Sequence, residues 1–354
     1  MNDVRASSDN FGGIRLIAAI TVILGHSFPL TGVGAAGYLG SPVSTLAVKV
    51  FFVISGYLIS ESWSRDPDVF RYFLRRSLRI FPGLIVLVVL SVFIVGPVFS
   101  ELELRDYFSS ANTWRYFSNI ALLPNYFLPG LFAENTYPNA VNGSLWTLPV
   151  EFAMYICTPV VLIIFRNSVS LGGFALALSI VSVWFTRIAI PEHSPVFWGT
   201  NLVNGLEMAP YFFWGAFYKK YESSHRLFNL QVALAMIVIL PLVTFNWASS
   251  EIISLVIVPY VTLSLGNAKS PVLGYFDRFG DVSYGTYLYG FLVQQLVASF
   301  LPHSNHWSNF LLSLFPSLLL GALSWHLVEK RMLKLKPSRK NSGVKAAYAF
   351  PRPD

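Results

Sequence analysis

The chain has 354 residues, of which 54% are hydrophobic and only 12% are charged, and its formal net charge is +7. Soluble domains carry about 25% charged residues, so this composition excludes an ordinary soluble protein. The apolar residues occur in blocks of roughly 17–22, which are long enough to cross a bilayer. The sequence therefore predicts an all-α, polytopic membrane protein. Its single cysteine, Cys157, excludes an intrachain disulfide.

Ten apolar segments are predicted in chain order to span the membrane as helices. They cover residues 14–31, 44–62, 79–98, 145–165, 171–189, 200–218, 231–247, 251–266, 282–301 and 309–329. Residues 99–144 form the one long connection. Its segment TWRYFSNIALLPNYF (113–127) is expected either to lie in the membrane interface as an amphipathic segment or to form an eleventh, re-entrant element.

The basic residues predict the orientation. Of the 25 Lys and Arg residues, all but Lys49, Arg105, Arg115 and Arg187 fall on one side if the N-terminus is cytoplasmic. The positive-inside rule then predicts that both termini are cytoplasmic, and it explains the positive net charge without a nucleic-acid partner. Residues 1–335 are predicted to form the membrane domain. Residues 336–354 are predicted to form a basic cytoplasmic tail that is disordered and contacts anionic lipid.

The first span carries a cation at one end and an imidazole at the other, in RLIAAITVILGH from Arg15 to His26. Eleven helical steps place the two side chains on one face, roughly 16 Å apart. On position alone, Arg15 could equally be an anchor at the cytoplasmic boundary or a functional residue. The alternative for His26 is a structural role in which it forms a hydrogen bond to another helix. Ionisable groups inside a membrane are functional by default because they are costly to bury. The pair suits a long ligand such as coenzyme A, with its phosphates near Arg15 and its thioester near His26 as a general base.

Several motifs in the same order resemble the membrane acyltransferase family 3, the bacterial O-acyltransferases that modify surface sugars. They are GGIRLIAAITVILGHSFPLTG, AVKVFFVISGYLIS, FLRRSLRIFP, VNGSLWTLPVEFAMYICTP, FGDVSYGTYLYGFLV and HLVEKRM. The likeness runs from about residue 11 to residue 332. Two departures stand out, because Lys49 replaces a common acidic or amide residue and Gly290 replaces a frequent His.

The resemblance implies a ten-helix fold in the bacterial inner membrane and acyl-coenzyme A as the cytoplasmic donor. It implies transfer of the acyl group, most simply acetyl, to a hydroxyl of a surface or lipid-linked glycan. It also implies that the Arg15–His26 pair is required and that no cofactor is permanently bound. His26 is then a catalytic residue, either as general base or as a transient acyl acceptor.

A basic segment precedes the third predicted span. Arg71, Arg75 and Arg79 recur every four residues and would line one helix face, with Arg76 beside them. Composition alone favours the interpretation that these cations only set the orientation of the chain in the membrane. Arg is nevertheless suited to phosphate, because its planar fork binds two oxygens at once. With the family pattern added, we expect Arg15, Arg75, Arg76 and Arg79 to bind the coenzyme A phosphates.

Glu151 follows the turn NGSLWTLP and is predicted to lie at a depth similar to that of His26, facing a common cavity. There it would act in catalysis by orienting the imidazole or by holding the acceptor sugar. The alternative is a carboxylate stabilised by its own helix N-terminus. Trp146 is expected to stack on the acceptor sugar or to anchor the chain at the interface.

Two more charges fall in the outer half of the membrane. Lys49 and Glu207 are expected inside the bundle, paired with each other or with Glu151. A structural ion pair or a share in acceptor binding would each account for them. Asp281 is predicted to be an N-cap of the ninth span. No group of His, Cys and carboxylate residues has metal-ligand spacing, so no metal is predicted.

Two other classes of protein would use buried charges in the same way. One is a transporter or flippase of a glycan precursor, and the other is a glycan-assembly component without chemistry. Transporters often carry broken helices in paired halves, and the sequence shows no such pairing. Consumption of acyl-coenzyme A would distinguish an acyltransferase from both alternatives.

Overall fold

The computed structural model of the protein describes residues 10–222, 227–240, 247–268 and 280–337, and these are mainly helical. The long segments are α1 (Phe11–Leu30), α2 (Val43–Arg65), α3 (Val69–Leu90) with η1 (Ser91–Val95) and α4 (Gly96–Phe99), η3 (Gly143–Trp146) with α7 (Thr147–Ile164), α8 (Ser168–Val183) with η4 (Trp184–Ile188), α9 (Leu202–Glu222), α10 (Leu230–Ile239), α11 (Trp247–Asn267), α13 (Ser283–Phe300), and α14 (His306–Ser324) with η7 (Trp325–Glu329) and α15 (Lys330–Leu333). Each of the ten predicted spans corresponds to one of these segments. The all-α, polytopic membrane fold is therefore confirmed. Residues 241–246 of one predicted span, and the predicted tail from residue 338 onward, lie outside the described residues.

Seven of the described helices are long and apolar enough to cross a membrane. Helices α9 and α10 are not among them, and neither is α13, although each corresponds to a predicted span. Most residues of α13 are buried, including Gln294 and Gln295, so its side chains contact protein rather than lipid. Gln294 Nε2 donates to the Ile23 carbonyl at 2.8 Å, and Gln295 Nε2 donates to the Ala140 carbonyl at 2.7 Å. A central helix with paired polar groups needs less apolar surface than one that faces lipid.

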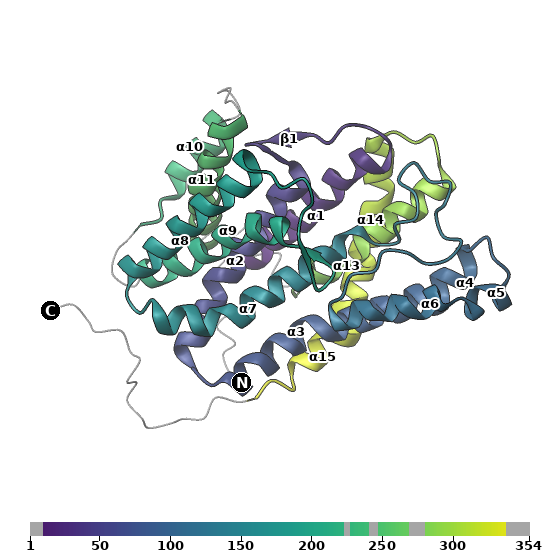
Figure 1. Cartoon of the computed structure of the whole chain (residues 1–354), viewed down its shortest axis with the longest axis horizontal. Coiled ribbons are helices and arrows are strands. Elements are labelled where there is room, and N and C mark those ends of the chain that lie inside the picture. Colours follow the sequence, from purple (N-terminus) through teal and green to yellow (C-terminus); the bar gives the residue numbers. More distant parts are fainter. Residues whose placement is uncertain (1–9, 223–226, 241–246, 269–279, 338–354) are drawn as a thin grey trace, which may run out of the picture.

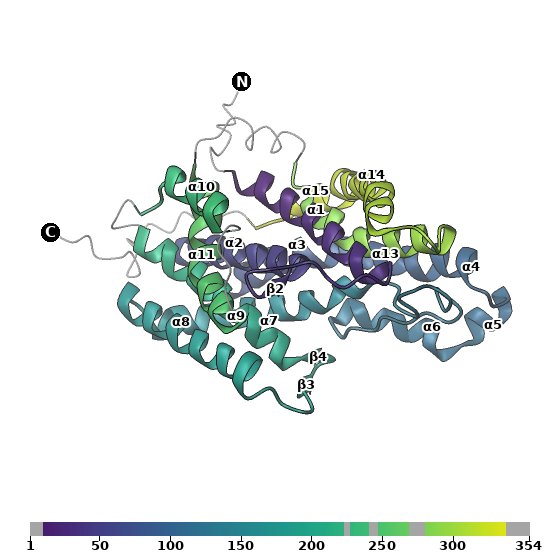
Figure 2. The same ribbon diagram turned by 90° about the horizontal axis from the view of Figure 1, so that it is seen from above.

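The helices form two groups on either side of α2 (Figures 1 and 2). Helices α8, α9, α10 and α11 lie on one side, and α3, α13 and α14 lie on the other. Helix α1 packs against α2, α13 and α14 and so joins the two groups. Below, the two ends of this bundle are named after the residues of α1 found there, as the Arg15 end and the His26 end.

Small residues allow the central helices to approach closely. A Cβ atom added to Gly56 of α2 would lie 1.8 Å from the Phe212 carbonyl oxygen of α9, and one added to Gly215 would lie 2.2 Å from the Val53 carbonyl oxygen. Glycines at such crossings are typical of helix packing in membranes. Gly56 and Gly215 therefore allow the backbones of α2 and α9 to pack against each other.

Helix α3 begins ten residues earlier than the predicted third span. Asp68 is its N-cap and accepts a hydrogen bond from the Arg71 backbone N–H at 2.8 Å. The basic segment is consequently part of the same continuous helix as the apolar span, and this places Arg71, Arg75, Arg76 and Arg79 on one rigid element.

The long connection contains α5 (Leu104–Ser109), α6 (Ala111–Arg115) and η2 (Tyr116–Ala121), which pack beside η1 and α3. The Tyr107 hydroxyl donates to the Val92 carbonyl in η1 at 3.0 Å. The segment runs back along α3, where Ala121 and Leu122 line a pocket with Phe81, and both the interfacial and the re-entrant alternatives stay predictions. Two short hairpins, β1 (Gly37–Tyr38) with β2 (Ser41–Pro42) and β3 (Val196–Phe197) with β4 (Thr200–Asn201), complete the described chain.

Candidate active site

A cavity of about 410 Å3 opens among α1, α2, α3, α7 and α13 near the Arg15 end. Its basic lining consists of Arg15, Arg75, Arg76, Arg79 and Lys336. Farther in, Phe51, Thr147 and Tyr287 are among the residues that line it. All four arginines predicted to bind coenzyme A therefore line one cavity, although they come from two helices. Whether they bind that ligand stays a prediction.

Two of these arginines meet at Asp281. Arg15 Nη1 lies 3.4 Å and Arg79 Nη2 lies 2.5 Å from Asp281 Oδ2. Burial raises the pKa of the Asp281 carboxyl, but the charges of Arg79 and Arg15 outweigh burial and bring the pKa below its usual range. The predicted N-cap role is wrong, because Val282 is the N-cap of α13 and no side chain caps that helix. The two cations hold the Asp281 carboxylate instead.

Glu329 is a further partner that the sequence did not single out. Its Oε2 lies 3.7 Å from Arg79 Nη1, and its Oε1 accepts a hydrogen bond from Ser324 Oγ at 2.8 Å. It lies in the quoted motif HLVEKRM and is the last residue of the tenth predicted span. A carboxylate within a predicted span was a signal for a buried partner, because burial without a cation is costly.

A second carboxylate, Asp66, binds the other end of the basic segment. Arg71 donates two hydrogen bonds to it, from Nε at 3.1 Å and from Nη2 at 2.6 Å, and Arg75 also pairs with it. The hydrogen bond from Arg71 is the main reason that the pKa of Asp66 falls to about 2, and Arg75 adds to the effect against the opposing cost of burial. Arg71 does not line the cavity. Its role is therefore to hold the loop before α3.

Arg76 is the arginine of the cavity that is most available to a ligand. Its guanidinium lies 6.0 Å from the ring centres of Tyr72 and Tyr155, and Nη2 donates to Ser62 Oγ at 3.4 Å. Within the described ranges it forms no ion pair, and its buried Nε has no hydrogen-bond partner. An unpaired guanidinium at a cavity wall is suited to bind an anion.

Glu151 lines the cavity opposite these cations. Its Oε1 accepts hydrogen bonds from Ser55 Oγ at 2.9 Å and from the Tyr155 hydroxyl. Sequence reasoning did not predict Ser55 or Tyr155 as its partners. Tyr155 lies four residues after Glu151, so the two share one face of α7.

His26 lies in a different place. Its ring packs edge-on against Phe291 with the ring centres 5.3 Å apart, and its buried Nδ1 has no hydrogen-bond partner in the described part of the chain. The preceding residue, Gly25, touches Ser44 at the start of α2. His26 does not line the cavity.

The expected common depth of His26 and Glu151 is therefore wrong. His26 lies level with Ser44 of α2, whereas Glu151 is bonded to Ser55 of that helix. Ser44 and Ser55 are eleven helical steps apart, which is roughly 16 Å along the axis. Counting residues from the predicted span ends missed this offset, because the helices cross the bundle at different heights.

The cavity nevertheless ends close to His26. Val48 and Tyr287 line it. Val48 lies one helical turn from Ser44, which touches Gly25. Tyr287 lies one turn from Phe291, which contacts His26. One turn corresponds to about 5.4 Å. The cavity thus runs from the arginines to within about one turn of the imidazole.

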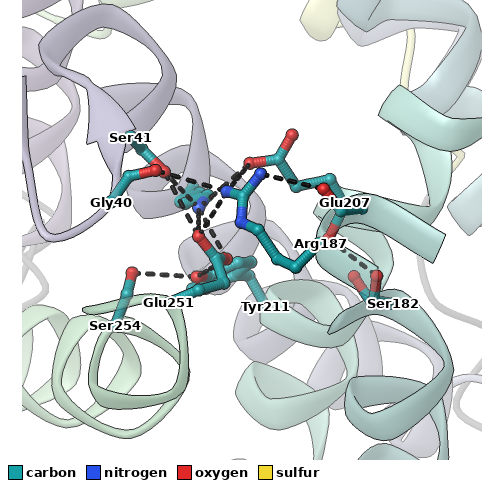
Figure 3. A network of polar contacts seen from close by, with 10 residues as sticks. Gly40, Ser41, Ser182, Arg187, Glu207, Tyr211, Glu251 and Ser254 are labelled. Carbon is teal, nitrogen blue, oxygen red and sulfur yellow. Dashed lines mark hydrogen bonds and ion pairs between the residues drawn. The ribbon is translucent and has the colours of Figure 1, made fainter. Parts of the chain in front are cut away.

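Lys49 belongs to a buried ion cluster, of which Figure 3 labels Arg187, Glu207 and Glu251. Its Nζ lies 3.1 Å from Glu207 Oε1 and 2.8 Å from Glu251 Oε1, and Arg187 Nη2 lies 2.9 Å from Glu251 Oε2. The predicted pairing of Lys49 with Glu207 is confirmed, but Glu251 and Arg187 were missed. The cluster joins α2, η4, α9 and α11. It lies apart from the cavity, and an acceptor-binding role for Lys49 and Glu207 stays a prediction.

Replacing Lys49 with alanine should reduce the free energy of unfolding by about 3–5 kcal/mol, because the substitution leaves buried carboxylates without their shared cation. Thermal and denaturant unfolding of the detergent-solubilised protein would measure the loss. Lys330→Ala is the matched control, since Lys330 is exposed on α15. Equal unfolding curves for the two variants would show that the cluster contributes little to stability.

Trp146 ends η3 half-buried, packs against the hydrophobic core and does not line the cavity. Its stacking on a sugar stays a prediction. Among the described residues no group of three or more His, Cys, Asp or Glu side chains is arranged to hold a metal ion.

The sequence matches one family of known proteins over most of its length. The profile of the acyltransferase domain family matches residues 9–326. The chain is 32% identical over 339 residues to an O-acetyl transferase of Shigella phage Sf6, covering 92% of this chain and 96% of the relative. It is 26% identical to nodulation protein 10 of Rhizobium leguminosarum bv. viciae, over 93% and 94% of the two chains.

A partial match covers 53% of this chain and 30% of the peptidoglycan O-acetyltransferase OatA of Listeria monocytogenes, with 27% identity. No solved structure matches the chain significantly.

Proposed function

Because the chain belongs to acyltransferase family 3, we propose that it transfers an acetyl group from cytoplasmic acetyl-coenzyme A to a hydroxyl of a cell-surface or lipid-linked glycan. The observation that carries the proposal is a cavity with four arginines at one end and His26 about one turn beyond the other end. The names of the phage and Listeria relatives support O-acetylation. The protein is then a membrane O-acyltransferase, and we place it in the bacterial inner membrane with the Arg15 end in the cytoplasm.

The basic end of the cavity is proposed to bind the coenzyme A phosphates. Arg76 lies at the wall without an ion-pair partner in the described chain, while Arg15 and Arg79 share Asp281 and Arg75 pairs with Asp66. Phosphate oxygens accept charge-assisted hydrogen bonds from guanidinium groups, often two at once. The carboxylates keep Arg15, Arg75 and Arg79 in place before the donor arrives.

The inner part of the cavity is proposed to hold the pantetheine arm. It is lined by Phe51, Tyr287 and Thr147, with Glu151 on the way. The Glu151 carboxylate is placed to accept a hydrogen bond from an amide N–H of the arm, which makes it a positioning residue of the donor site. Close packing around the arm would keep water away from the thioester.

The reaction needs a base at the tip of the arm. His26 takes the proton from the acceptor hydroxyl, and the resulting oxygen attacks the thioester carbonyl carbon. The new carbon–oxygen bond forms as the carbon–sulfur bond breaks. The coenzyme A thiolate leaves and receives the proton that His26 had taken. In the alternative with a transient acyl-histidine, His26 first takes the acyl group from the thioester as the coenzyme A thiolate leaves. The acceptor hydroxyl then takes the acyl group from His26 and releases the imidazole.

Mass spectrometry of surface glycans tests the function directly. Cells that contain the protein should carry acetyl esters that are missing from cells without it. Inside-out membrane vesicles with the protein should consume added acetyl-coenzyme A and release free coenzyme A. A transporter would change glycan export without consuming the donor, and that result would overturn the proposal.

A further inference from the structure

Phe291 is the side chain that separates the end of the cavity from the space around His26. It lies one turn beyond Tyr287, which lines the cavity, and its ring contacts the His26 ring edge-on at 5.3 Å. It is only 5% exposed. A group that reaches the imidazole along α13 from the cavity must therefore pass or contact this ring.

The position of the ring is tightly determined. A Cβ atom added to Gly143 would lie 2.8 Å from Phe291 Cε2, and the Tyr137 ring lies edge-on with its centre 6.1 Å away. Leu30 and Ala140 form one hydrophobic cluster with Phe291. The ring is thus enclosed by α1 and by residues 137–143, and it has little room to move away from His26.

The backbone that carries the ring is held as well. Gln294 Nε2 donates to the Ile23 carbonyl at 2.8 Å, and Asn142 Nδ2 donates to the Leu288 carbonyl at 2.7 Å. These bonds tie α13 to α1 on one side and to the chain before η3 on the other. Shifting the backbone at Phe291 would require breaking these buried hydrogen bonds, which is costly.

Under the proposed function, the acyl group lies beside His26 while the hydroxyl attacks. The thioester carbon must approach the imidazole, so the carbons beyond it occupy the space that the Phe291 ring borders. Protein interiors are close-packed, and a fixed aromatic ring there leaves space for a short acyl group. A longer chain would overlap the ring.

We propose that Phe291 is the residue that limits the length of the acyl group, and so makes the protein an acetyl rather than a longer-chain acyl transferase. This inference rests on the proposed function and deepens it. Phe291 is a specificity-determining residue in this proposal and not a catalytic one, because it has no group that transfers a proton.

A competition experiment tests the inference. Inside-out vesicles receive equal concentrations of acetyl-coenzyme A and butyryl-coenzyme A, and mass spectrometry measures the ratio of butyryl to acetyl esters on the glycan. In Phe291→Ala this ratio should rise by about tenfold or more, since even one methylene in an apolar pocket changes selectivity by roughly 10- to 200-fold. Phe291→Leu should shift the ratio in the same direction by a smaller amount.

Leu292→Ala is the matched control. Leu292 is the next residue on α13, equally buried, and belongs to the main hydrophobic core rather than to the cluster beside His26. Its truncation should lower both products together and leave their ratio unchanged. The ratio does not depend on how much of each variant folds, so it separates a steric role from a loss of stability.

Three results would overturn the inference. They are an unchanged ratio in both Phe291 variants, an equal shift in Leu292→Ala, and a loss of both esters in both Phe291 variants. Absence of acetyl esters with the unsubstituted protein would instead overturn the proposed function, so the two failures are distinguishable.

Discussion

Replacing His26 with alanine should abolish acetyl transfer while the protein still inserts and folds. A general base contributes typically 10²- to 10⁴-fold to a rate, and transfer in the variant should fall by about that factor or more. His26 is suited to this role because its buried Nδ1 has no partner in the described chain and its ring lies just beyond the arginine-lined cavity. The rate of acetyl ester formation in inside-out vesicles would measure the loss.

His306→Ala is the matched control for this experiment. The His306 ring stacks on Phe28 with the ring centres 4.4 Å apart, at the same end of the bundle as His26. Its loss should leave transfer close to normal. Coenzyme A binding should also survive in His26→Ala, because the arginines are untouched. Near-normal acetylation in the His26 variant would remove this residue from the chemistry.

Replacing Arg76 with alanine should weaken coenzyme A binding more than acceptor binding. A hydrogen bond to a charged group is worth about 1.5–3 kcal/mol, which corresponds to roughly a 10- to 150-fold rise in Kd. Arg76→Lys should restore only part of the affinity, because lysine lacks the planar fork. Calorimetric titration of the detergent-solubilised protein with coenzyme A would measure both effects.

The chain provides a control for Arg76 on the same helix. Arg71 lies five residues earlier, is bound by Asp66 and Asp68, and does not line the cavity. Arg71→Ala should therefore leave the Kd for coenzyme A within about twofold, well inside the 1.4 kcal/mol that a tenfold change requires. Equal losses of affinity in the two variants would indicate that the basic segment acts through its total charge and not through a defined site.

The sequence predicts the arginines of the basic segment but not their acidic partners. The arginines were recognised from their spacing, because one helix face repeats about every four residues. The sequence predicts Asp281 as a helix cap, whereas in the structure it binds Arg15 across 266 positions of sequence. Its position just before a helix fits a cap and an ion pair equally well, and only the packing of α1, α3 and α13 decides between them.

Sequence alone determined the features that depend on composition and on local helix geometry. Long apolar blocks need a bilayer, basic residues gather between them, and Arg15 and His26 share a face because they lie on one helix. Only the tertiary structure decided which side chains meet across helices. Lys49 binds Glu251 from 202 positions away, Glu151 faces the arginines instead of His26, and Phe291 is the residue packed against the His26 imidazole. The physical reason is that helical periodicity fixes the direction of a side chain relative to its own helix, whereas the rotation and height of each helix in the bundle depend on close packing at residues such as Gly25 and Gly56.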